Sequence, residues 1–171
     1  YFDPYLFFSL FLLSTLGLFF LFSASNSDIS IVSKQLVYVV AGFIIMILVS
    51  QPDPDIFRRT SGLFLMFSLS LLGITYLFGP EINGAQRWVR LGPFSFQSSE
   101  LLKLAVPIFL ANFLFDKKLP IQRKEIIFSF LLIFSCFFFV FIQPDLGTAL
   151  IIACSGLFVL FLSGLSWTFI G

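Results

Sequence analysis

The chain has 171 residues, of which 58% are hydrophobic and 11% charged, and its formal net charge is +1. A soluble domain of this length could not bury so much apolar surface, so most of the chain must lie in lipid. The near-neutral charge gives no indication of a nucleic-acid partner, and the lack of His in the sequence excludes His-based acid–base chemistry and His metal sites.

Apolar segments predict an all-α polytopic membrane protein, because a helix needs about 20 mostly apolar residues to cross the hydrocarbon. About six transmembrane spans are expected, in one integral-membrane domain covering 1–171: 5–23, 31–50, 61–79, 97–115, 126–142 and 146–166. In the fourth span only residues 104–115 are free of charge, too few to cross. That helix must therefore begin near Gln97, which draws Glu100 and Lys103 into the membrane or its outer boundary, where charged groups are costly and usually functional or paired.

The distribution of Lys and Arg predicts the orientation of the loops, because cytoplasmic loops carry an excess of positive charge. This places 51–60 and 116–125 in the cytoplasm, and 24–30, 80–96 and 143–145 outside. The external loop 80–96 nevertheless contains Arg87 and Arg90, which oppose the bias. Since these arginines do nothing for orientation, we expect them to have a specific role.

Arg87, Trp88 and Arg90 have two interpretations. Trp favours headgroup depth and Arg can extend to lipid phosphates, so the three could be interfacial anchors. Alternatively, the guanidinium groups form an anion clamp that binds phosphate bidentately in a partly dry site. Gly84 and Gly92 flank the segment and permit tight turns, so it could fold back as a cap on the helical bundle.

Glu100 and Lys103 are three residues apart and share a helix face, so they can form an ion pair. One interpretation is a self-neutralising structural pair, and the other is a charged site at the outer edge of the membrane, next to the arginines. We expect both to hold, with the pair positioning the site rather than performing chemistry.

Asp145 lies in the sequence "QPDLGTA", residues 143–149, and also has two interpretations. It could cap the sixth helix within a tight external hairpin. It could instead be a ligand for a metal ion or for a substrate hydroxyl. The motif by itself favours the cap, while the expected position of Asp145 on the same side of the membrane as Arg87 strengthens the second interpretation.

Four motifs occur in one order: "GAQRW", "FQSSELLKLAVP", "QPDLGTALI" and "SGLFVLFLSGLSW". In this the chain resembles the shape, elongation, division and sporulation (SEDS) family of polytopic membrane proteins, and its rod-shape members more than its division members. The resemblance covers the whole chain, most specifically residues 84–167. One departure is Ser98, where the family has Pro; Ser98 can cap instead, and we expect the fourth helix to start in nearly the same place.

The resemblance implies a peptidoglycan glycosyltransferase of the bacterial cytoplasmic (inner) membrane that serves cell-wall elongation and rod shape. Family members polymerise lipid II, a disaccharide–peptide on undecaprenyl pyrophosphate, on the outer face of the membrane. They need a divalent cation (Mg or Mn), whose ligands here are unknown, and a class B penicillin-binding protein. The family fold has ten transmembrane helices, so the chain is expected to be an N-terminal fragment that is inactive alone.

The resemblance also guides the expected roles of the site residues. The Asp usually assigned as the catalytic base lies in a later external loop of the family, so no catalytic residue is expected within 1–171. Arg87 and Arg90 are assigned to the phosphates or to the groove leading to them. Lys103 is expected to assist, held by Glu100, while Trp88 anchors the loop or stacks on sugar.

Two other functions are compatible with the sequence. A flippase for the same lipid would also use intramembrane charges, although transporters often show internal repeats and discontinuous helices near the midplane. No repeat is evident here, and the charges lie at one face. A non-catalytic membrane scaffold of the elongation machinery would predict that removing the charges at 87–103 has no effect.

Overall fold

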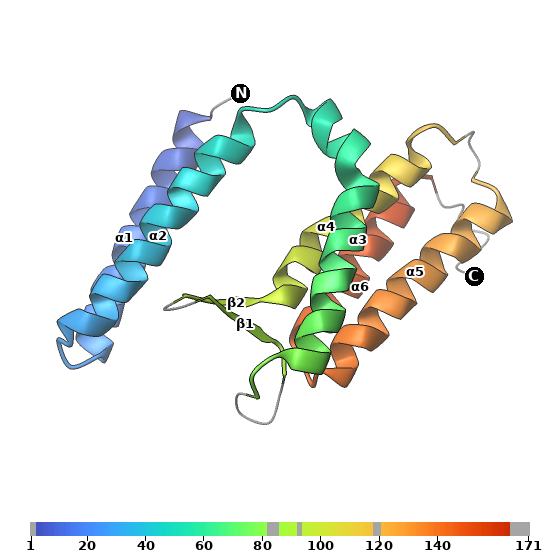
Figure 1. Cartoon of the computed structure of the whole chain (residues 1–171). Helices are drawn as coiled ribbons and strands as arrows, with labels where there is room; N and C mark the ends of the chain where they lie inside the picture. The colour runs from blue at the N-terminus through green and yellow to red at the C-terminus, as the bar shows by residue number, and fades with distance from the viewer. Residues whose placement is uncertain (1–2, 82–85, 92–93, 118–120, 165–171) are drawn as a thin grey trace. The chain divides into compact units, whose positions relative to one another are not determined.

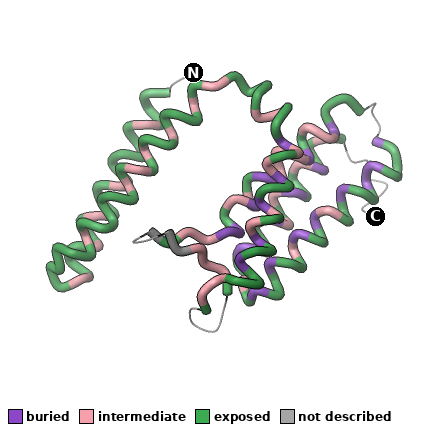
Figure 2. Tube along the Cα trace, in the orientation of Figure 1, coloured by how far each residue is buried: buried purple, intermediate pink, exposed green. Residues whose placement is uncertain are grey.

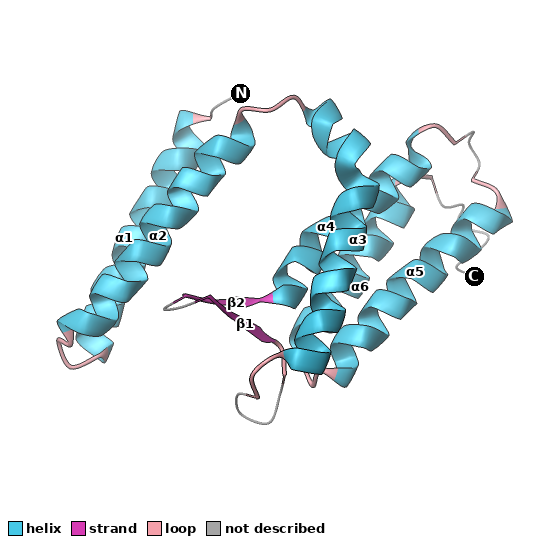
Figure 3. Ribbon diagram, viewed as in Figure 1, coloured by secondary structure: helices cyan, strands magenta, loops and turns pink. Residues whose placement is uncertain are grey.

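The computed structural model describes the chain except for residues 1–2, 82–85, 92–93, 118–120 and 165–171. The chain divides into two compact units, Tyr1–Asp53 and Pro54–Gly171. Within the described residues there are six helices and one pair of strands (Figure 3). Five of the helices are long and apolar enough to cross a membrane, and the sixth, Leu146–Leu162, is shorter but also apolar.

The first unit is a helical hairpin of α1 (Pro4–Ala24) and α2 (Ile29–Ser50) (Figure 1). Each helix begins with an aspartate that accepts hydrogen bonds from backbone N–H groups of the first turn, Asp3 in α1 and Asp28 in α2. None of the described residues of α1 or α2 is buried within the protein (Figure 2). Apolar side chains with so little protein contact are suited to a lipid environment.

The second unit is a bundle of four helices and a β-hairpin (Figure 1). Its elements are α3 (Pro54–Phe78), β1 (Trp88–Leu91), β2 (Phe94–Gln97), α4 (Ser98–Phe115), α5 (Arg123–Ile142) and α6 (Leu146–Leu162). Helix α4 is central, because it packs against α3, α5 and α6. Its fully buried apolar residues form the middle of the core: Leu102, Ala105, Val106 and Leu110.

The six helices overlap the six expected spans, but α6 ends at Leu162 rather than near residue 166, and the start of α3 is shifted further. Helix α3 begins at Pro54 rather than near residue 61, because a helix can continue beyond its apolar portion and include Arg58 and Arg59. Helix α4 begins at Ser98, close to the expected start. The end of α3, the β-hairpin, the start of α4 and the α5–α6 turn gather at one end of the bundle (Figure 1). The described parts of the segment 80–96 and the turn 143–145, both expected outside, therefore lie at the same end of the bundle.

The hairpin was not expected, since the segment 80–96 was interpreted as a loop that could fold back as a cap. Strands β1 and β2 are antiparallel, with Trp88 opposite Gln97 and Leu91 opposite Phe94. A signal was present in "FSFQ", where apolar and polar residues alternate with the period of a strand.

Candidate functional site

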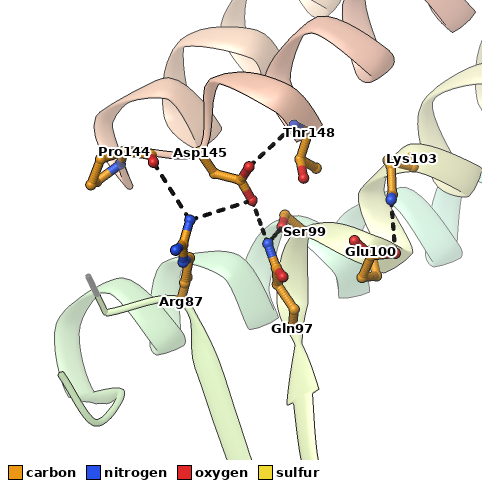
Figure 4. Close-up of polar contacts among 8 residues, drawn as sticks. All are labelled: Arg87, Gln97, Ser99, Glu100, Lys103, Pro144, Asp145 and Thr148. Carbon is orange, nitrogen blue, oxygen red and sulfur yellow. Dashed lines mark hydrogen bonds and ion pairs between the residues drawn. The ribbon is translucent and has the colours of Figure 1, made fainter. Parts of the chain in front are cut away.

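The Asp145 carboxylate joins three segments at this end of the bundle (Figure 4). Its Oδ1 accepts a hydrogen bond from the backbone N–H of Thr148 at 3.2 Å, which caps the start of α6. Its Oδ2 accepts a hydrogen bond from Gln97 Nε2 and lies 3.9 Å from Arg87 Nη1. Arg87 Nη1 also donates to the backbone carbonyl of Pro144 at 3.5 Å. We call Arg87, Gln97 and Asp145 the outer node.

The outer node is poorly exposed. The side chain of Asp145 is 14% exposed and that of Arg87 is 27% exposed. Charges attract each other more strongly in such surroundings than on an open surface, because less water screens them. Arg87 Nε is buried and has no acceptor among the residues that the structure describes. Arg87 is thus held in place through one nitrogen while keeping unused hydrogen-bonding capacity.

Gln97 was not among the expected site residues, although it links Asp145 to the first turn of α4. It occupies the N-cap position of α4, but its side chain does not cap the helix. It donates instead to Ser99 Oγ at 2.9 Å and to Asp145. Ser98, which was expected to cap, is the first helical residue, and its buried Oγ has no partner among the described residues. That expectation was wrong because the helix starts one residue too early for Ser98 to be the cap.

The expected ion pair between Glu100 and Lys103 is confirmed, with Lys103 Nζ 2.8 Å from Glu100 Oε2. The Lys103 side chain is 24% exposed and that of Glu100 is 46% exposed. From Gln97 to Lys103 the helix rises about 9 Å. The charged residues therefore continue from the outer node along the first two turns of α4, as Figure 4 shows.

The structure places Trp88 and Arg90 in β1 but does not test their expected contacts. Trp88 is partly buried and lies opposite Gln97, which ties it to the strand that leads into the node. Arg90 lies opposite Ser95, and its side chain is outside the described part of the structure. The assignment of Arg90 to phosphates and of Trp88 to sugar stacking stays a prediction.

The described residues do not fit a divalent cation. They contain no group of three His, Cys, Asp or Glu side chains able to hold a metal ion. Both carboxylate oxygens of Asp145 already face donors, and one of these donors is a guanidinium. A cation at Asp145 would be repelled by Arg87. Asp145 is the N-cap of α6, and its expected contact with a substrate hydroxyl stays a prediction.

Comparison with known proteins agrees with the resemblance in sequence. The family FTSW_RODA_SPOVE, described as "Cell cycle protein", matches residues 4–171. The chain belongs to this family. Members of the FtsW/RodA/SpoVE family include peptidoglycan glycosyltransferase MrdB of Escherichia coli (strain K12), which is 37% identical over 169 residues, or 99% of this chain and 46% of MrdB. RodA of Treponema pallidum (strain Nichols) is 32% identical over 95% of this chain and 39% of that protein.

Solved structures show the same fold. The crystal structure of rod shape determining protein RodA from Thermus thermophilus matches with a TM-score of 0.88 and 30% identity, over 96% of this chain and 55% of RodA. A chain of a peptidoglycan synthase complex that coordinates polymerization and crosslinking matches with a TM-score of 0.88 and 30% identity, over 98% of this chain and 49% of that chain. The chain thus spans about half the length of the relatives it matches. As a family member it is a multi-pass protein of the bacterial inner membrane.

Proposed function

We propose that this protein acts in peptidoglycan glycosyltransfer, as the membrane-embedded part that binds lipid II by its pyrophosphate on the outer face. The names of its relatives support the reaction, since MrdB and RodA are peptidoglycan glycosyltransferases. The observation that carries the proposal is the position of the outer node and of the Glu100–Lys103 pair at one end of the bundle. That end is the expected external end.

The proposed role of these residues is electrostatic. Transfer of the sugar releases a pyrophosphate, and cations fixed in advance in a poorly hydrated site stabilise the charge that develops there. Asp145 and the Pro144 carbonyl hold Arg87, whose guanidinium has five N–H donors in all. Glu100 likewise holds Lys103, whose ammonium has three donors. Both cations can bind phosphate oxygens with donors that these contacts leave unused.

The remaining parts of the reaction are proposed for the whole protein. A divalent cation, Mg or Mn, would neutralise phosphate charge when bound, but the outer node does not offer it ligands. A class B penicillin-binding protein is the proposed partner, supported by the similar chain within a peptidoglycan synthase complex. No described residue is assigned as the catalytic base.

Substitution of Arg87 tests the proposal. Lys keeps the charge of Arg but not its planar fork, so Arg87→Lys should weaken the binding of undecaprenyl pyrophosphate to the chain in vesicles, and Arg87→Ala should weaken it further. The same order is expected for glycan chain formation from fluorescent lipid II by the protein with its partner, normalised to folded protein.

A matched control is Arg59→Lys, because Arg59 is exposed at the opposite end of α3. This variant should bind and polymerise as the unmodified protein does. Unchanged binding and activity in both Arg87 variants would contradict the role given to Arg87. Translocation of lipid II across vesicles without polymer formation would favour a flippase instead.

A further inference from the structure

The β-hairpin has two faces of different character. Its four cross-strand pairs, from the base toward the tip, are Trp88 with Gln97, Val89 with Phe96, Arg90 with Ser95, and Leu91 with Phe94. Residues directly opposite each other lie on the same face, and successive residues lie on opposite faces. The second and fourth pairs are wholly apolar, whereas the first and third each contain polar residues. The register thus gives the hairpin an apolar face and a polar face.

The outer node shows which way the polar face is turned. Gln97, on the polar face, donates to Asp145 in the turn before α6. Figure 1 shows that α3 and α5 continue past the start of α4 at this end of the bundle, so the turn between α5 and α6 lies farther out than the hairpin. The polar face is therefore turned toward the end of the bundle, and the apolar face is turned toward the level of the membrane-spanning segments.

The hairpin lies at the depth of a membrane boundary. Strand β2 leads into α4 without an intervening residue. The 18 residues of α4 span about 27 Å of a hydrocarbon core of about 30 Å, so the start of α4 lies near the edge of that core. The strands extend sideways from this point, across the direction of the helices, as Figure 1 shows. The hairpin thus follows the plane of the membrane.

The helices of the bundle leave the apolar face of the hairpin open. Among the elements that the structure describes in the bundle, the two strands pack mainly against each other and not against a helix. Val89 and Phe96, on the apolar face, are each only partly buried. An isolated two-stranded hairpin is at best marginally stable in water and needs a further surface against its apolar side. A surface from outside the bundle must supply that cover.

We infer that the hairpin is an interfacial anchor, whose apolar face rests on the acyl chains of bulk phospholipid at the expected outer surface of the membrane. Its polar face then meets headgroups and water. The polar face contains Trp88 and Arg90, which are residue types suited to headgroup depth. A protein cover fits less well, because a standard interface takes about 20–30 residues from each side, whereas the apolar face has four.

The anchor sets the depth of the outer node, because Arg87 directly precedes β1 and Gln97 ends β2. The inference does not depend on the function proposed above, since the ligand is the membrane surface and not a substrate.

Tryptophan fluorescence in vesicles tests this inference. The sequence contains two tryptophans, Trp88 and Trp167. Both are replaced by Phe, and a single reporter is introduced by Phe96→Trp or, as the matched control on the opposite face, by Ser95→Trp. The vesicles contain phosphatidylglycerol and phosphatidylcholine, and the phosphatidylcholine is brominated at one of two acyl-chain depths, so that quenching reports depth. The Phe96→Trp reporter should lie about 5–10 Å deeper than the Ser95→Trp reporter, since apolar faces of interfacial helices enter the membrane to that extent.

A charge on the apolar face should release the hairpin from lipid. The reporter here is Val89→Trp, opposite residue 96. Phe96→Glu should move this reporter to a shallower depth, because a carboxylate is costly among acyl chains, whereas Ser95→Glu should leave it in place. All variants should keep the helical content of the unmodified chain.

Equal depths of the Phe96→Trp and Ser95→Trp reporters would overturn the inference. Quenching of both by iodide in the water, but by neither brominated lipid, would also overturn it, since the hairpin would then stand in water. A Phe96→Trp reporter shielded from both kinds of quencher would overturn it as well, because protein, such as a second copy of the chain, would then cover the apolar face. None of these results bears on the proposed function, which is tested separately by the binding of undecaprenyl pyrophosphate.

Discussion

Charge removal at Glu100 and Lys103 probes how far the charged site enters the membrane. Helix α4 has 18 residues, which at 1.5 Å per residue span about 27 Å. The hydrocarbon core measures about 30 Å, so α4 has no residues to spare outside it. Lys103, in the second turn, must then lie at or below the outer boundary. We expect the free-energy effects of removing Glu100 and Lys103 to be coupled, because at that depth each charge is neutralised mainly by the other.

The size of the coupling follows from the exposure of the two side chains. Breaking a fully buried pair by removing one partner costs about 3–5 kcal/mol, whereas exposed pairs contribute about 1 kcal/mol or less. Lys103 is 24% exposed and Glu100 is 46% exposed, with 2.8 Å between Nζ and Oε2. The pair is thus intermediate, and a coupling free energy of about 2 kcal/mol is expected.

A double-mutant cycle with Glu100→Gln and Lys103→Met measures this coupling by reversible unfolding in mixed micelles. The matched control is the pair of Asp55 and Arg58, which has the same i,i+3 spacing and a distance of 3.3 Å but is more exposed, at 58% and 33%. Its coupling should stay below about 1 kcal/mol. If the Glu100 and Lys103 effects add within about 0.5 kcal/mol, the two side chains are independent and the reasoning from membrane depth is refuted.

Three further outcomes can be measured on the same protein. Gly156→Ala should destabilise it by about 1–3 kcal/mol in the unfolding assay, since the new Cβ would lie 2.7 Å from Ile133 Cγ1; an unchanged midpoint would contradict the packing of α5 on α6. Ser98→Pro should raise the free energy of unfolding by about 0.5–1 kcal/mol. The first helical position favours Pro, and the residue before it is extended. The hydroxyl that the substitution removes has no partner among the described residues. The hydrogen bond from the Ser30 N–H lowers the pKa of Asp28 below 3.8, so this cap should persist at neutral pH and be lost only as the pH falls below that value, which amide chemical shifts of Ser30 would report.

Features set by local spacing could be predicted from the sequence. Apolar runs predicted the helices, the i,i+3 spacing predicted the pair of Glu100 and Lys103, and Asp145 after a Pro predicted a helix cap. The contact of Gln97 with Asp145 could not be predicted, because the two are 48 positions apart and meet only through the packing of α4 against α6. The direction of the Gln97 side chain depends on that contact, since it bonds across the node instead of capping its own helix.

The outer node also gives a reason why an arginine could be tolerated on the expected external side, where the bias of Lys and Arg disfavours it. Asp145 neutralises Arg87 within the protein, so the arginine adds little net charge to the end that is expected to be external. Because Asp145 both caps α6 and pairs with Arg87, Asp145→Asn should affect the start of α6 and the β-hairpin differently. Asn is about as good an N-cap as Asp, so α6 should keep its start, while loss of the ion pair should loosen the hairpin and raise amide exchange in residues 88–97. The uncompensated Arg87 should at the same time bind undecaprenyl pyrophosphate more tightly, because a competing anion has been removed. Tighter binding together with faster exchange is expected in vesicles of the same composition. Weaker binding would mean that the carboxylate holds Arg87 in the orientation that the phosphate requires, and that positioning outweighs charge at this site.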